Sequence, residues 1–233
     1  MAIAGVSNLS LVDFDGYLTY TIFFSGCNMR CPFCHNSIIV LNNFKDDELS
    51  FSSIIEDLKT RINKIDAVCF SGGEPTLDPR LKQFIIEVKK LGFLIKLDTN
   101  GTRPEVVEDL LKNNLIDYIA MDIKSSFKRY SIATGVENDL NLIRRNVNII
   151  KSSGVQYEFR TTLVDELHDV ETLVEMIENI KPFPKLVFQQ FVDRGACIKK
   201  GLHPFPYEKI LEVKRRYPDL NIETRGYDSK ESR

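Results

Sequence analysis

Cys27, Cys31 and Cys34 stand close together in the chain, spaced C-x3-C-x2-C. Three thiolates on one loop can bind three of the four irons of a cubane iron–sulfur cluster. The remaining cysteines, Cys69 and Cys197, are too distant in sequence to be an obvious fourth ligand. The spacing therefore predicts a 4Fe–4S cluster with one iron left open, where a substrate can bind.

A structural zinc site of the Cys3His type is the main alternative, with His35 as its fourth ligand. His35 directly follows Cys34, however, and adjacent side chains rarely converge on one tetrahedral ion. The chain also lacks the paired C-x2-C spacing of common zinc sites. A disulfide framework is disfavoured, because five cysteines are an odd number and nothing marks the chain as secreted.

The run from Gly26 to Asn36, GCNMRCPFCHN, resembles the cluster loop of radical S-adenosylmethionine enzymes, most closely that of the activating enzymes of glycyl radical proteins. The upstream residues 10–16, SLVDFDG, resemble the longer anaerobic ribonucleotide reductase activating proteins. Those proteins usually carry an aromatic-Pro-Gly where this chain has Phe14-Asp15-Gly16. The resemblance extends to about Phe191 and implies a partial (β/α)6 barrel, open on one side, that binds a 4Fe–4S cluster and S-adenosylmethionine.

The composition is that of a globular protein with a balanced charge. The chain has 233 residues and a net charge of −2, which argues against a general nucleic-acid surface. We expect one domain, with a core over about residues 12–191 and a helix and tail over 192–233. The sequence shows neither a signal peptide nor a membrane-spanning run, so a cytoplasmic protein is expected, in an anaerobic setting that would protect an exposed cluster.

Six short apolar segments alternate with amphipathic helical patterns. This alternation predicts an α/β fold in which helices cover a parallel sheet. Ser50 is expected to cap the first of the longer helices, Gly92 to end the next, and Pro104 to begin the third. Beyond a helix over about 206–217, the charged end is expected to fray. The expected strands are residues 18–24, 67–70, 94–97, 118–121, 157–163 and 186–191.

Polar and glycine-containing motifs recur at or near the carboxyl ends of these strands. In βα barrels and open α/β sheets, ligands bind at that edge, so a single site is expected there. The motifs, in chain order, are the cysteine loop (residues 26–36), Gly72-Gly73-Glu74-Pro75, Asp98, Asp122-Ile123-Lys124, and Gln189 with Gln190.

Gly72 and Gly73 would let the backbone approach a ligand closely, and Glu74 would supply an anionic acceptor beside it. Alone, two glycines would indicate a tight turn between strand and helix. In the family that the cysteine loop resembles, the matching segment binds the amino group of S-adenosylmethionine.

Four charged residues are further candidates for the same site. Asp98 would bind polar groups of the cofactor or a cation. Asp122 and Lys124, two residues apart, lie on the same side of a strand end, and the resemblance assigns them to the cofactor site rather than to a surface ion pair. Arg160 interrupts an apolar strand and is expected to meet a carboxylate, either that of the cofactor or one in an internal salt bridge.

The remaining candidates are uncharged or histidine side chains. Phe33 would form a wall against adenine or pack in the core, Asn36 would fix the loop, and His35 would donate near the cluster or the adenine. Gln189 and Gln190 alternate across their strand, so only one faces the site, and Gln189 is the candidate. His168 is expected at the surface or in a turn.

The resemblance also implies a reaction. S-adenosylmethionine would chelate the open iron, and its reductive cleavage would give a 5′-deoxyadenosyl radical that takes hydrogen from a glycine of a partner enzyme. Anaerobic ribonucleotide reductase is the first partner expected, and pyruvate formate-lyase or another glycyl radical enzyme the second. The electron would come from a separate flavodoxin or ferredoxin, and no catalytic acid or base is assigned.

Two alternatives remain open at this point. One is a radical enzyme acting on a small molecule, in the manner of 7-carboxy-7-deazaguanine synthase. The other is a zinc-stabilised binding module without catalysis.

Overall fold

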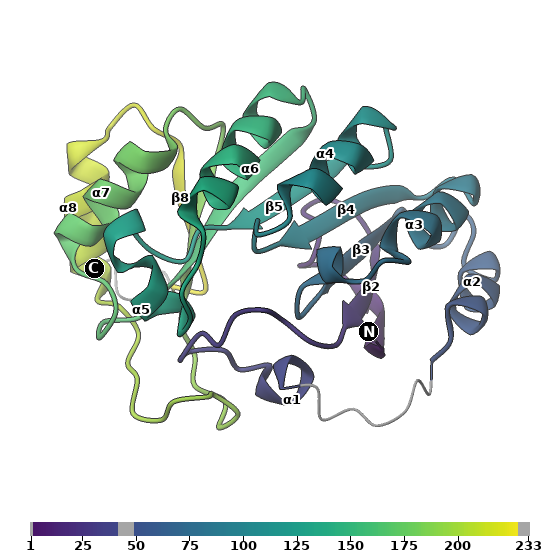
Figure 1. Cartoon of the computed structure of the whole chain (residues 1–233), viewed down its shortest axis with the longest axis horizontal. Coiled ribbons are helices and arrows are strands. Elements are labelled where there is room, and N and C mark those ends of the chain that lie inside the picture. The colour runs from purple at the N-terminus through teal and green to yellow at the C-terminus, as the bar shows by residue number, and fades with distance from the viewer. Residues whose placement is uncertain (1, 42–48, 228–233) are drawn as a thin grey trace.

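The computed structural model describes residues 2–41 and 49–227, and its strands form one sheet (Figure 1). The order of the strands in the sheet follows their order in the chain. The first two strands are antiparallel, and every later pair of neighbours is parallel. The strands are β1 (Ile3–Ser10), β2 (Thr19–Phe24), β3 (Ala67–Gly72), β4 (Leu94–Thr99), β5 (Tyr118–Asp122), β6 (Gln156–Leu163), β7 (Leu186–Gln190) and β8 (Ile222–Arg225).

The longer helices follow one another in an arc around the outside of the strands, α5 lies next to α7, and α1 lies away from the arc, below β2 in this view (Figure 1). Among the described residues, no helix has the length and apolar character needed to cross a membrane. The α-helices are α1 (Ser37–Val40), α2 (Phe51–Lys59), α3 (Leu81–Lys90), α4 (Pro104–Lys112), α5 (Tyr130–Thr134), α6 (Leu140–Ser152), α7 (Val170–Ile180) and α8 (Tyr207–Arg216), and the short 3-10 helices are η1 (Pro75–Leu77) and η2 (Phe127–Arg129).

Local sequence signals explain where several helices begin and end. The Ser50 hydroxyl accepts a hydrogen bond from the Ser53 N–H and caps α2, as predicted. Gly92 follows the end of α3 with φ +91°, a conformation that glycine adopts without strain. Pro104 is the first residue of α4, where its missing N–H costs nothing.

The six predicted strands are β2 to β7, and the predicted α/β partial barrel is confirmed. Two strands, β1 and β8, were not predicted from the sequence. β1 is an edge strand that contains Gly5 and several polar residues, and β8 has four residues of which only Ile222 is apolar, so neither shows a clear alternation. The expectation that the chain frays after α8 is wrong for residues 222–225, which pair with β7, while 228–233 lie outside the described residues.

The connection between β1 and β2 links the two ends of the sheet. Phe14 is buried there against Tyr118, the first residue of β5, with ring centroids 5.2 Å apart. Asp15, which departs from the usual aromatic-Pro-Gly, forms ion pairs with Arg225 of β8 at 3.0 Å and with Lys185 at 3.4 Å. The segment before β2 is therefore tied to the last strand, 210 residues later.

The packing of β8 against the rest of the protein can be tested with one pair of substitutions. Ile222 is buried, so Ile222→Ala should lower the free energy of unfolding by about 2–5 kcal/mol. Glu223→Ala, at an exposed position of the same strand, should change it by less than about 0.5 kcal/mol. Urea unfolding measures both, and equal small effects would mean that β8 does not pack in solution.

Candidate active site

A cavity of about 220 Å³ lies at the carboxyl ends of the parallel strands. It brings together residues that are up to 162 positions apart in the chain, from Cys27 to Gln189. The predicted site residues that line it are Cys27, Cys31, Phe33, Cys34, His35, Asn36, Gly72, Gly73, Asp98, Asp122, Lys124, Arg160 and Gln189. One predicted residue, Glu74, is not among the residues that line this cavity.

Backbone hydrogen bonds hold the cysteine loop on several sides. The Gly26 N–H donates to the Ile39 carbonyl of α1 at 2.7 Å, and the Arg30 N–H donates to the Thr134 carbonyl of α5 at 2.7 Å. Within the loop, the Cys34 N–H donates to the Cys31 carbonyl at 2.9 Å. These bonds fix the direction of the loop independently of any bound group.

The three thiols lie in an environment that disfavours free ionisation. Burial raises the pKa of all three, to about 11 for Cys31, although Lys124 acts in the opposite direction on each. The Cys27 sulfur accepts hydrogen bonds from the Met29 N–H at 3.4 Å and from Asn100 Nδ2 at 3.7 Å. Donors of this kind stabilise a sulfur that carries negative charge, as a metal-bound thiolate does.

This donor set fits an iron–sulfur cluster. Within the described ranges, no three His, Cys, Asp or Glu side chains are grouped so that they could hold one metal ion. A cubane takes one thiolate on each iron, so its ligands need not converge on a single ion. Three thiols on the wall of one cavity, with hydrogen-bond donors to one sulfur, satisfy the chemical requirements of such a cluster.

The glycine pair after β3 allows two loops to touch. A Cβ atom on Gly73 would lie 1.9 Å from the Gly26 carbonyl oxygen, and one on Gly72 would lie 2.5 Å from the Phe24 nitrogen. Gly72 also has φ +109°, which disfavours any side chain. The glycines are thus required for contact with the cysteine loop, in addition to any approach of a ligand.

The Glu74 side chain is fully buried, and its carboxylate, predicted to accept from a ligand, is hydrogen-bonded within the protein. One carboxylate oxygen accepts from the Thr99 hydroxyl at 2.8 Å and the other from the Asn100 N–H at 2.6 Å. Thr76 donates both its hydroxyl and its N–H to the same carboxylate. Glu74 therefore joins the loop after β3 to the loop after β4, since a buried carboxylate needs several donors.

Asn100 is a site residue that sequence analysis did not single out. It lines the cavity, and its Nδ2 contacts both the Cys27 sulfur and, at 2.9 Å, the Asn28 Oδ1. Asp98-Thr99-Asn100-Gly101 looks like an ordinary turn in sequence. The contact joins residues more than 70 positions apart, so it is visible only in the folded structure.

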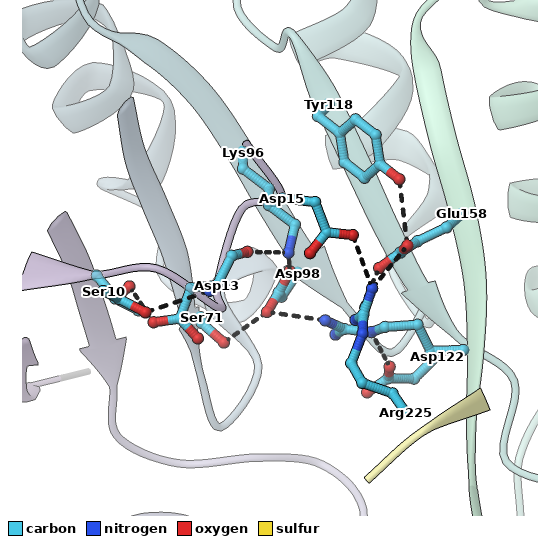
Figure 2. A network of polar contacts seen from close by, with 12 residues as sticks. Ser10, Asp13, Asp15, Ser71, Lys96, Asp98, Tyr118, Asp122, Glu158 and Arg225 are labelled. Carbon is cyan, nitrogen blue, oxygen red and sulfur yellow. Dashed lines mark hydrogen bonds and ion pairs between the residues drawn. The ribbon is translucent and has the colours of Figure 1, made fainter. Parts of the chain in front are cut away.

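The charged candidates form a ladder of ion pairs inside the barrel, and Figure 2 shows Lys96, Asp98 and Asp122 in the polar network to which it belongs. Arg160 contacts Asp122 at 2.9 Å and Asp98 at 3.3 Å. Lys124 pairs with Asp122 at 2.9 Å, and Lys96, a buried residue of β4, pairs with Asp98 at 3.1 Å. Burial alone would raise the pKa of Asp122, but Arg160 and Lys124 hold it at about 2. Of the two origins expected for the carboxylate that meets Arg160, the structure shows the internal salt bridge.

His168 lies beside a turn, as expected, but it is buried and not at the surface. Its Nδ1 lies 3.1 Å from both the backbone nitrogen and the carbonyl oxygen of Val164, and its Nε2 lies 3.0 Å from the Lys124 carbonyl oxygen. Burial lowers the pKa of this imidazole. His168 therefore supports the backbone at Lys124 in its neutral form.

Comparisons with known proteins agree with this geometry. Residues 21–181 match the family model "Radical SAM superfamily". The chain is 36% identical over 230 residues to a Methanocaldococcus jannaschii protein named "Putative glycyl-radical enzyme activating enzyme MJ1227", covering 93% of each chain. It is 29% identical to the pyruvate formate-lyase-activating enzyme of Clostridium pasteurianum, covering 79% of each.

A crystal structure of Streptococcus suis SuiB bound to S-adenosylmethionine has a similar fold, with a TM-score of 0.67 at 16% identity. That alignment covers 88% of this chain and 52% of SuiB. The chain belongs to the radical SAM superfamily and, within it, to the glycyl-radical enzyme activating enzymes.

The contact between the two loops can be tested at Gly73. Gly73→Ala would push a methyl group into the Gly26 carbonyl, so we expect a loss of about 1–3 kcal/mol in the free energy of unfolding. The variant should also retain less iron after reconstitution, because the cysteine loop must move. Gly5→Ala is the matched control, since a Cβ there meets nothing within 4 Å. Equal iron retention in both variants would show that the contact is not required.

The neutral state of His168 predicts a pH dependence. Its folded pKa lies below the unfolded value of about 6.5, so protonation favours the unfolded chain and stability falls as the pH drops below about 6.5. Each pH unit in that range should cost about 1 kcal/mol, until the folded pKa is reached. Urea unfolding of wild type and His168→Asn at pH 7.5 and 5.5 should show a smaller loss in the variant. An identical loss in both would contradict a neutral, buried imidazole.

Proposed function

We propose that this protein generates a glycyl radical on a partner enzyme, using a 4Fe–4S cluster and S-adenosylmethionine. One observation supports this most strongly. The loop that carries the only closely spaced cysteines lies beside the glycine pair and the charged ladder, on the wall of one cavity. The similarity to the M. jannaschii protein over nearly the whole chain supports the same reaction class.

Cys27, Cys31 and Cys34 would bind three irons of the cluster, and the fourth iron would take the cofactor. When bound, the cluster and S-adenosylmethionine together supply a reductively formed 5′-deoxyadenosyl radical that abstracts hydrogen. The protein supplies position and charge. Asn100 and the Met29 N–H stabilise the Cys27 sulfur, and the other residues shape the pocket around the cofactor.

The residues of the site have separate roles in this proposal. The backbone at Gly72 and Gly73 would receive the amino group of the cofactor. Lys124, which borders the cavity close to Cys31, would attract its carboxylate. Phe33, a buried side chain on the same wall, would pack against the adenine. Glu74 would act indirectly, by holding the two loops together.

The interior of the barrel favours a substrate that enters from the cysteine-loop side. The ion pairs of Lys96, Asp98 and Arg160 stand between this cavity and a second one, which is lined by Phe14, Glu158 and other residues of the opposite edge. The similarity to the glycyl-radical enzyme activating enzymes favours a protein partner over a deazapurine-type substrate.

The partner we propose first is anaerobic ribonucleotide reductase, on the resemblance of residues 10–16, and the second is an enzyme of the pyruvate formate-lyase type, on the similarity to the C. pasteurianum protein. A flavodoxin or ferredoxin would donate the electron. With five cysteines in the chain and three in the loop, two are left, too few for a further cluster of four thiolates.

The proposal predicts a stable glycyl radical in trans. The reconstituted, reduced protein is mixed anaerobically with S-adenosylmethionine and each candidate partner, and the electron spin resonance spectrum is recorded. One partner should develop a glycyl doublet. Cys31→Ala should abolish that signal, whereas Cys197→Ala, outside the loop, should retain it.

Two results would contradict the proposal. The first is cleavage of S-adenosylmethionine that is stimulated by a small deazapurine precursor while no candidate protein develops a radical. The second is a protein that takes up zinc alone under anaerobic reconstitution, which would favour the non-catalytic binding module.

A further inference from the structure

The loop that follows β7, residues 192–200, packs against the cysteine loop. The Lys199 N–H donates to the Pro32 carbonyl at 2.9 Å, and the Cys197 thiol donates to the Phe33 carbonyl at 3.8 Å. Both acceptors are backbone groups between the second and third cysteines of the loop. Residues 26–36 and 192–200 therefore form one continuous surface beside the three thiols.

This surface is basic, although the chain as a whole has a net charge of −2. Its two segments contain four cations, Arg30, Arg194, Lys199 and Lys200, and a single anion, Asp193, so their net charge is +3. All four cations are exposed. Within residues 2–41 and 49–227, no carboxylate forms an ion pair with any of them. Their charge is therefore available to a partner.

The four cations lie outside the cavity, whereas the three thiols line it. The Arg30 guanidinium is held against the backbone of the cysteine loop, where it donates to the Cys27 carbonyl at 2.6 Å and to the Met29 carbonyl at 2.8 Å. Burial lowers the pKa of His35, and the charge of Arg194 lowers it further, which places Arg194 close to the end of the loop. A substrate that reacts inside the cavity has no need of this surface.

A partner that only delivers an electron does fit it, because such a partner must come close to the cluster but need not enter the cavity. Electron-transfer complexes have small, transient interfaces, and opposite charges on the two partners supply the rate of association. A net charge of +3 beside the thiols selects an acidic partner.

Two apolar side chains lie among the cations. Val192 and Ile198 are 50% and 38% exposed, and both belong to the same loop as Arg194 and Lys199. An apolar centre with a charged rim is typical of a protein interface. The dimethylbenzene edge of a flavin, surrounded by carboxylates, is complementary to such a surface.

We propose that Arg30, Arg194, Lys199 and Lys200, with Val192 and Ile198, form a docking surface for a small acidic flavoprotein. This surface is called the basic face below. The inference rests on the proposed function, since it requires a cluster in the cysteine loop. In the transfer, the reduced flavin loses one electron and the cluster gains it, while no bond forms or breaks and no proton needs to move.

The test reverses two charges of the basic face. Lys199→Glu/Lys200→Glu changes the net charge of the two segments from +3 to −1 and keeps the backbone N–H that donates to Pro32. Lys64→Glu/Arg215→Glu is the matched control. It makes the same change in charge at two exposed positions shortly before β3 and β8, at the opposite edge of the sheet.

The measurement is the rate at which reduced flavodoxin bleaches the visible absorption of the reconstituted cluster in a stopped-flow instrument. At low ionic strength, Lys199→Glu/Lys200→Glu should lower the second-order rate constant about tenfold or more. The control should stay within about twofold of wild type, and the difference should shrink at about 0.5 M salt, where surface charges are screened. Dithionite, which needs no docking surface, should reduce the cluster of all three proteins to the same extent.

Two results would overturn the inference. One is an equal rate of reduction by flavodoxin in wild type and Lys199→Glu/Lys200→Glu at low ionic strength. The other is slower formation of the glycyl radical by this variant after dithionite has reduced it, because the basic face would then bind the partner enzyme. Reduction by an acidic ferredoxin, with none by flavodoxin, would contradict the assignment of a flavoprotein.

Failure of the proposed function gives a different result, since dithionite would then find no cluster to reduce. Calorimetric binding of oxidised flavodoxin tests the basic face separately, and the charge reversal should weaken it about tenfold or more at low ionic strength. If the double variant fails to fold, Lys200→Glu alone should show a smaller loss in the same direction. The absence of any loss in Lys200→Glu would then contradict the inference.

Discussion

The site depends on the close approach of two backbones, at Gly26 in the cysteine loop and at Gly73 after β3. The Glu74 N–H donates to the Gly26 carbonyl at 2.9 Å, and the Gly73 N–H donates to the Phe24 carbonyl at 2.8 Å. No side chain other than hydrogen fits at Gly73. This contact fixes the position of the cysteine loop relative to the strand ends. It therefore also fixes where the three thiols lie relative to the other residues of the cavity.

Electrostatics imposes the second constraint. Charged side chains inside a barrel are costly unless each one is paired. The protein meets this requirement with alternating charges on neighbouring strands, and it extends the pattern to Glu158, Lys185 and Arg225 at the other end of the interior. The ladder is therefore both a part of the site and a reason why the barrel can hold a polar interior.

Much of this arrangement could be predicted from the sequence, because it follows from local patterns. The cysteine spacing and the strand–helix alternation are visible in the sequence. Ligands bind at the carboxyl edge of parallel strands, so these patterns predicted that most candidate residues lie on the wall of one cavity. The long-range details could not be predicted. Glu74 turned inward because Thr76, Thr99 and Asn100 offer it four donors, and no pattern in the sequence marks that pairing. Likewise β8 is too short to show a period, and nothing in the sequence around His168 marks it as buried beside the Lys124 carbonyl.

We propose that three thiols hold a cluster whose fourth iron is free for S-adenosylmethionine. The most direct test of this proposal is the electron spin resonance spectrum of the anaerobically reconstituted, reduced protein before and after S-adenosylmethionine is added. We predict about four irons and four sulfides per chain, and a spectrum that changes with the cofactor because it binds iron directly. A cluster of full iron content whose spectrum is the same with and without S-adenosylmethionine would contradict the account.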